Sequence, residues 1–228
     1  MVLSPVTNLT TISLEFSDDF GVLFDAIARD LQRDGYSIQP NALPKNLIDA
    51  LRETLLALGP ELFRQAGVGR AKQHMANSAI RRDEISWIES DSGAQGQWLD
   101  FAARLQQHLN RSLMLGLFSF ESHFAHYAPG AFYKTHVDAF KGQANRVLSV
   151  VLYLNEDWDD GNGGEMVLYS DSQPAQALQM VKPEPGTLAV FLSEDFPHEV
   201  LPANRDRYSI AGWYRVNTSS AGRIDPPA

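Results

Sequence analysis

The spacing of apolar residues divides the chain into a first half with helical periodicity and a second half of short extended segments. Three segments in the first half place apolar residues three and four apart, as the buried face of a helix requires. They are residues 20–33 (Val22, Leu23, Ala26, Ile27, Leu31), the stretch after 41–44 (Leu47, Ile48, Leu51, Leu55, Leu56) and residues 97–115 (Trp98, Phe101, Leu105, Leu109, Leu113). Asp34 and Gly35 mark the end of the first segment. We interpret these stripes as core-packing faces that brace a sheet.

From about residue 118 the pattern changes to short runs rich in Val, Tyr, Phe and Leu, separated by Gly, Pro and Asp. The predicted strands are residues 119–127, 132–137, 146–154, 165–169, 177–181, 187–192, 198–200 and 207–214, with 81–88 as a further edge strand. Because no helical crossovers separate them, they predict a two-sheet jelly roll and not a parallel sheet. The fold class is therefore mainly β with bracing helices.

This pattern predicts one structural domain with three regions. Residues 1–117 are expected to form a helical support region with early strands, continuous with a β core at 118–216, and residues 217–228 a loose tail. A segment at residues 65–78, rich in glycine, alanine and polar residues, is expected to be either a lid over a substrate or an ordinary connector.

Composition narrows the functional classes. The 228 residues carry a net charge of -9, which argues against a general nucleic-acid binder. The absence of cysteine excludes disulfides, thiolate zinc sites and cysteine nucleophiles. No signal peptide and no apolar run of membrane-spanning length is evident, so we expect a cytoplasmic protein without a membrane partner. The oligomeric state is left open.

His136 and Asp138 form a candidate metal site with His198. The first two are one residue apart, so on an extended strand both side chains point to the same side, and His198 would come from a distant strand. Two imidazoles and one carboxylate are the ligands of non-haem ferrous ions that keep open positions for oxygen and a co-substrate. With six histidines in the chain, such a pair arises easily by chance, so it needs support from other residues.

Arg207, nine residues after His198, supplies that support. An arginine that points into a β barrel is costly unless it meets a carboxylate, and its guanidinium matches the distal carboxylate of 2-oxoglutarate. Tyr127, Tyr133 and Tyr153 lie on strands that should line the same cavity. Together these residues predict an oxygen-activating hydroxylase.

Five motifs in the same order resemble the 2-oxoglutarate- and iron(II)-dependent prolyl hydroxylases, in particular the branch of the hypoxia-inducible-factor prolyl hydroxylases and their bacterial relatives. The motifs are IRRDEISWI at 80–88, YAPG at 127–130, HVD at 136–138, LYLNEDWD at 152–159 followed by Gly163 and Gly164, and HEV at 198–200 with RYSIAGWY at 207–214. The resemblance covers residues 80–214 and implies a double-stranded β-helix, another name for this jelly roll.

The resemblance also implies roles for single residues. His136, Asp138 and His198 would bind Fe(II), and Arg207 with Tyr153 would bind the 5-carboxylate of 2-oxoglutarate. The co-substrate pocket and the approach to it would be lined by Tyr127, Met166 and Trp213. The substrate itself would approach along Tyr133, Arg82, Asp83 and Trp87. The other expected cofactors are O2 and, as a reductant, ascorbate. The products would be succinate, carbon dioxide and a hydroxylated substrate.

The chain departs from the family pattern at three places: Arg82 replaces a common glycine, Glu165 replaces an apolar residue, and the interval from Tyr127 to His136 is shorter. These departures bear on substrate choice. The leading expectation is a prolyl residue in a protein or peptide, such as a component of the translation machinery. The alternatives are a free amino acid or small metabolite, a zinc hydrolase, or a cupin-like binding module without enzymatic activity. A nucleic-acid demethylase or a halogenase fits less well.

Overall fold

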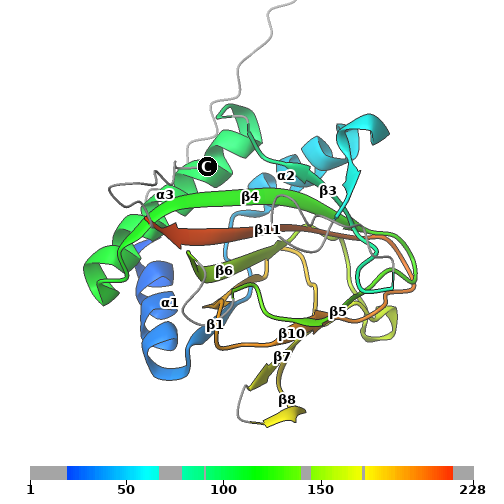
Figure 1. Cartoon of the computed structure of the whole chain (residues 1–228). Coiled ribbons are helices and arrows are strands. Elements are labelled where there is room, and N and C mark those ends of the chain that lie inside the picture. Colours follow the sequence, from blue (N-terminus) through cyan, green and yellow to red (C-terminus); the bar gives the residue numbers. More distant parts are fainter. Residues whose placement is uncertain (1–19, 67–78, 90, 140–144, 171–172, 218–228) are drawn as a thin grey trace, which may run out of the picture.

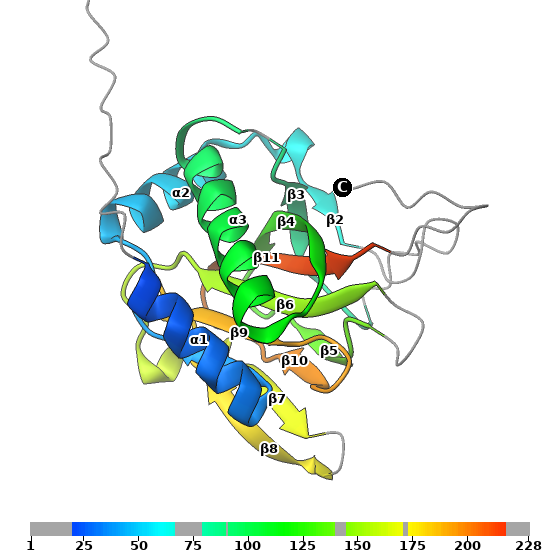
Figure 2. The same ribbon diagram turned by 90° about the vertical axis from the view of Figure 1, so that its left-hand side faces the viewer.

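Two antiparallel sheets face each other, and three helices cover the outer side of the larger sheet (Figures 1 and 2). The computed structural model describes residues 20–66, 79–89, 91–139, 145–170 and 173–217. Most of the segment predicted as a lid or connector, residues 67–78, and the tail at 218–228 lie outside these described residues. No helix within them is both long and apolar enough to cross a membrane.

The larger sheet has seven strands and the smaller sheet four. The order in the larger sheet is β1 (Tyr36–Gln39), β9 (Leu188–Leu192), β6 (Arg146–Tyr153), β11 (Arg207–Val216), β4 (Leu117–Tyr127), β3 (Glu84–Trp87) and β2 (Arg64–Gln65). The order in the smaller sheet is β5 (Tyr133–His136), β10 (His198–Val200), β7 (Met166–Ser170) and β8 (Gln173–Val181). Two 3-10 turns, η1 (Pro60–Leu62) and η2 (Asp160–Asn162), complete the described elements. The predicted fold class, a jelly roll with bracing helices, is confirmed.

All eight predicted strands and the edge strand are present, with ends that differ by a few residues. Two short strands, β1 and β2, were not predicted from the sequence. They have four and two residues, too few for a period-2 pattern to stand out. β1 pairs with β9 and β3 pairs with β4, so strands from the first half of the chain extend both sides of the larger sheet.

The three predicted helices are α1 (Gly21–Asp34), α2 (Lys45–Ala57) and α3 (Gly93–Leu113). Two predicted core positions are wrong: Val22 is 77% exposed and Leu56 is 48% exposed. In α1 the buried stripe is centred on Phe24 and Ala28 with Ile27, so Val22 falls on its solvent side in the first turn. Gly35 adopts the left-handed conformation that closes α1, in agreement with the sequence pattern.

The main core lies between the helices and the larger sheet. It joins the helix stripes to every second residue of the central strands, for example Phe124, Leu152, Ile210 and Tyr214. Because side chains alternate along a strand, the residues between them point to the opposite face, toward the smaller sheet. That inner face carries Tyr127 on β4 as well as further residues on β6 and β11, namely Ser149, Tyr153, Arg207 and Trp213. The polar chemistry therefore gathers between the two sheets.

Candidate metal and co-substrate site

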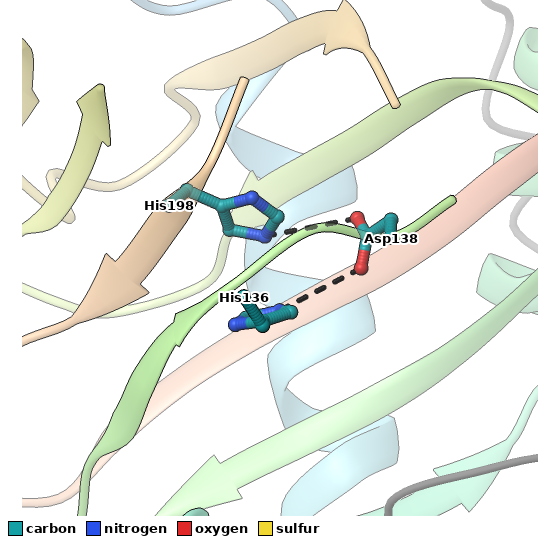
Figure 3. Close-up of side chains that lie close together, drawn as sticks. All are labelled: His136, Asp138 and His198. Carbon is teal, nitrogen blue, oxygen red and sulfur yellow. Dashed lines mark ion pairs between the residues drawn. The ribbon is translucent and has the colours of Figure 1, made fainter. Parts of the chain in front are cut away.

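His136, Asp138 and His198 meet between the sheets, with their side chains directed toward one another (Figure 3). His136 ends β5, Asp138 follows two residues later, and His198 begins β10, which pairs with β5 so that the two histidines face each other in register. One ligand atom from each residue lies within 4.8 Å of the others. The predicted triad is thus brought together from positions sixty residues apart.

The hydrogen bonds of the two imidazoles fix which nitrogen is available to a metal. His136 Nδ1 lies 2.9 Å from the carbonyl oxygen of Lys134, and His198 Nδ1 lies 3.1 Å from that of Phe196. A carbonyl oxygen only accepts, so each Nδ1 carries the proton, and in the neutral ring each Nε2 keeps a free lone pair. Backbone partners of this kind orient metal-binding histidines in proteins generally.

The charge state also fits a divalent cation. The two Nε2 atoms lie 3.6 Å and 3.7 Å from the carboxylate oxygens of Asp138, within ion-pairing distance but beyond hydrogen-bond range, so both imidazoles converge on the carboxylate. Burial and, next, the charge of the neighbouring His136 lower the pKa of His198 to about 4. Burial opposes ionisation of Asp138, yet His198, His136 and the Ser149 hydroxyl hold its pKa well below the ordinary value. At neutral pH the site therefore combines the neutral imidazole of His198 and the carboxylate of Asp138 with the imidazole of His136, and two imidazoles with one carboxylate are the donor set of a ferrous ion.

Arg207 forms the second half of the site. It is 2% exposed, and its guanidinium lies between the rings of Tyr127 and Tyr153, at 4.9 Å and 5.0 Å from their centroids. Its Nε donates to the carbonyl oxygen of Gly164 at 2.8 Å, and its Nη1 approaches Ser209 Oγ at 3.4 Å. Among the residues that the structure describes, no carboxylate lies within ion-pairing distance of Arg207. A buried cation without an anionic partner is costly, so the site suits an anionic ligand.

Gly163 and Gly164 form a tight turn, and this turn shapes the surroundings of Arg207. Both have positive φ angles, and a Cβ at Gly164 would come within 3.2 Å of Arg207 Cδ. The glycine therefore lets the backbone carbonyl approach the guanidinium closely. Glu165, which departs from the family pattern, follows this turn and precedes β7.

The other predicted co-substrate residues surround Arg207 and the triad. Burial raises the pKa of both Tyr127 and Tyr153, so their phenols are neutral donors at pH 7. The Tyr153 hydroxyl is buried without a hydrogen-bond partner among the described residues, as is Trp213 Nε1. Met166 is 1% exposed and packs in the same cluster as Tyr153. Their placement around the inner face agrees with a ligand-binding interior.

The predicted substrate-approach residues divide into two groups. Arg82 and Trp87 are exposed; Arg82 lies over the Phe132 ring at 4.9 Å, and Trp87 meets the His123 ring edge-on at 5.2 Å. Asp83 is fully buried, and its two oxygens accept hydrogen bonds from Arg81. Any influence of Asp83 on a substrate would therefore pass through Arg81.

The ion pair of Arg81 and Asp83 is connected to the triad through Tyr133. The Arg81 guanidinium lies 4.3 Å from the centroid of the Tyr133 ring, and that ring stacks on His136 at 3.5 Å with an interplanar angle of 15°. The bridge between Arg81 and Tyr133 brings the start of the IRRD motif beside β5. Tyr133 thus packs against a metal-ligand candidate. Arg81 also contacts the Tyr133 ring, and Asp83 orients Arg81 through two hydrogen bonds.

His123 is an interior residue that the sequence reasoning missed. It pairs across the sheet with Trp87 on β3 and lies 5.4 Å from the ring of Trp213, with a buried Nδ1 that has no partner among the described residues. A signal was available: His123 is four residues before Tyr127 on β4, so both point to the same face. Burial, and next the charge of Arg81, lower its pKa to about 4.

This histidine should make the metal-free protein sensitive to acid. Its pKa is about 4 in the folded chain against an ordinary histidine pKa of 6.5 in the unfolded chain, so the unfolded chain takes up the proton first. The stability that it contributes is full above pH 6.5 and is lost as the pH falls toward 4, by at most about 3 kcal/mol. We expect His123→Gln to reduce the loss of unfolding free energy between pH 7.5 and pH 5, measured by urea denaturation. An unchanged pH dependence would show that His123 is not protonated in this way.

Comparisons with known proteins agree with this site. Residues 122–215 match the 2OG-Fe(II) oxygenase superfamily. A Pseudomonas putida prolyl-4-hydroxylase is 39% identical, with a TM-score of 0.77 over 85% of this chain and 99% of that chain. The prolyl hydroxylase of Trichoplax adhaerens, solved with a hypoxia-inducible-factor peptide fragment, is 26% identical, with a TM-score of 0.73 over 85% of this chain and 89% of that chain.

Among curated proteins, human Egl nine homolog 1 is 31% identical over 144 residues, which are 59% of this chain and 33% of that protein. The chain spans between a third and about half of the length of the human, mouse and rat forms of this relative. The solved bacterial relative is matched over nearly its whole length. The chain belongs to the 2OG-Fe(II) oxygenase superfamily, and its most similar solved structures include prolyl hydroxylases.

Proposed function

We propose that the protein hydroxylates a prolyl residue of a protein or peptide, with Fe(II), 2-oxoglutarate and O2 as cofactors, and releases succinate and carbon dioxide. The observation that carries this proposal is the convergence of a two-histidine, one-carboxylate triad with the buried guanidinium of Arg207 between the same two sheets. Two of the similar solved structures are named as prolyl hydroxylases, which favours proline as the target.

In this proposal each residue has a defined task. His136, Asp138 and His198 hold the iron, which when bound couples the oxidative decarboxylation of 2-oxoglutarate to hydroxylation of a C–H bond. Arg207 pairs with the distal carboxylate of 2-oxoglutarate, and the free Tyr153 hydroxyl donates to the same group. Tyr127, Met166 and Trp213 line this pocket, exclude water and fix the orientation of the co-substrate.

The residues that would contact the substrate are proposed from their positions near the metal site. Tyr133 stacks on His136, Arg82 is exposed just before β3, and Trp87 is exposed at the end of β3. An exposed aromatic and a guanidinium suit a peptide chain, whose backbone offers carbonyl acceptors and whose proline offers an apolar ring. A protein of the translation machinery is the substrate that we propose to test first, and ascorbate is a candidate reductant.

The test is consumption of 2-oxoglutarate together with mass spectrometry of the substrate. Iron-loaded protein is incubated with proline-containing peptides from translation proteins, with the same peptides carrying alanine at the proline, and with free proline. The proposal predicts a gain of one oxygen on the proline peptide, in step with succinate formation, and no gain on the alanine control. Oxidation of free proline alone would replace it with a metabolite hydroxylase. Absence of any 2-oxoglutarate turnover with iron bound would reject the oxygenase function.

A further inference from the structure

Two buried serines lie behind the carboxylate of Asp138. Ser149, on β6, places its Oγ 2.6 Å from Asp138 Oδ2 and 2.9 Å from the Oγ of Ser193. Ser149 is 1% exposed and Ser193 is fully buried. Hydroxyls in such a dry environment are costly unless they are bonded, so this arrangement is specific.

The direction of the hydrogen bonds follows from the charge of Asp138. An ionised carboxylate only accepts, so the single Ser149 proton is donated to Asp138. Ser149 has no second proton for Ser193, and therefore Ser193 must donate to Ser149. The resulting chain runs from Ser193 through Ser149 to Asp138, with each bond polarising the next.

The Ser193 end of this hydrogen-bond chain is anchored to the central sheet. Ser193 follows β9 directly, and its backbone N–H donates to the carbonyl oxygen of Val147 on β6 at 3.0 Å. The segment after Ser193 leads to His198, the third candidate ligand, at the start of β10. Asp138, by contrast, lies in a bend after the end of β5, where no strand pairing restrains it. The serines thus connect the least restrained ligand to the central sheet.

We propose that Ser149 is a positioning residue for Asp138, and that Ser193 supports it through the same hydrogen-bond chain. By occupying one lone pair of Oδ2, Ser149 fixes the rotation of the carboxylate and favours binding of a metal through one oxygen. This inference rests on the proposed metal function of the triad.

The test is titration of the metal-free protein with Co(II), followed by calorimetry and by the visible absorption bands of the bound ion, which report ligand geometry. Ser149→Ala should weaken Co(II) binding by roughly 10- to 100-fold and shift the bands. Ser193→Ala should give a smaller loss in the same direction, and Ser149→Thr, which restores a hydroxyl on a β-branched side chain suited to a strand, should recover most of the affinity.

A double variant shows whether Ser193 acts through the hydrogen-bond chain or independently of Ser149. If Ser193 acts only through Ser149, Ser149→Ala with Ser193→Ala should bind Co(II) as Ser149→Ala does alone. Additive losses of Co(II) affinity would overturn the action of Ser193 through Ser149. Wild-type Co(II) affinity and absorption bands in Ser149→Ala would overturn the positioning role of Ser149.

Ser122→Ala is the matched control. Ser122 is a buried serine on β4 that faces the helices and accepts a hydrogen bond from Trp98 Nε1 at 3.1 Å. It should lower the unfolding free energy without any change in Co(II) affinity. If the wild-type protein itself fails to bind Co(II) or Fe(II), the triad assignment fails, which is distinguishable from a failure confined to the serine variants.

Discussion

Replacing Asp138 with alanine is expected to remove Fe(II) binding and turnover together. Asp138 is the only carboxylate in the described triad, and the two histidine Nε2 atoms lie on either side of it at 3.6 Å and 3.7 Å. Without it, two imidazoles would have to bind a hydrated divalent cation with no anionic ligand beside them. The loss of affinity should exceed the roughly 100-fold that follows from changes to the outer partners of a ligand. Anaerobic calorimetry with Fe(II) and a succinate assay measure the two effects.

A loss of Fe(II) binding in Asp138→Ala is informative only if the variant is folded and a comparable aspartate variant keeps its activity. Asp206 provides one, because it also pairs with a histidine, His126 Nε2, at 2.7 Å, but it lies on the loop before β11 and away from the triad. Asp206→Ala should leave Fe(II) affinity and turnover unchanged. Circular dichroism shows whether Asp138→Ala keeps its secondary structure. Wild-type turnover in folded Asp138→Ala would reject the triad as the metal site.

The sequence predicted the elements better than the contacts between them. Short runs rich in Val, Tyr, Phe and Leu located every strand except β1 and β2, and helical stripes located all three helices, because burial of side chains imposes these patterns directly. The stripes could not give the exact rotation of each helix, so Val22 and Leu56 were wrongly assigned to the core. The rotation depends on which neighbouring surface the helix meets.

The site was predictable where residues share one strand and less so where they come from several. His136 and Asp138 follow from their spacing, but their meeting with His198 depends on the pairing of β5 with β10. Ser149 could have been found, since it lies four residues before Tyr153 on β6 and must share its face. The stack of Arg81 on Tyr133 could not, because it depends on an isolated bridge between distant segments.

Replacing Arg207 with alanine is expected to weaken 2-oxoglutarate binding while iron binding persists. The guanidinium is buried, oriented by Gly164 and enclosed by the rings of Tyr127 and Tyr153, so a carboxylate that reaches it is shielded from water. Loss of one partner of a buried charge pair costs about 2–5 kcal/mol, or roughly 30- to 5,000-fold in Kd. Anaerobic titration of the ferrous protein, followed by the charge-transfer absorption of chelated 2-oxoglutarate, gives this Kd directly.

Two variants show whether the charge or its geometry matters. Arg207→Lys keeps a positive charge but loses the planar fork, so it should recover only part of the affinity. Arg205→Ala, two residues earlier, removes an exposed guanidinium that donates to the carbonyl oxygen of Asp157, and should bind 2-oxoglutarate as the wild type does. If Arg207→Ala binds 2-oxoglutarate with unchanged Kd, the arginine is a structural residue held by Gly164 and Ser209. The co-substrate carboxylate would then have to be bound by other residues of the inner face, with the unpartnered Tyr153 hydroxyl as the first to test.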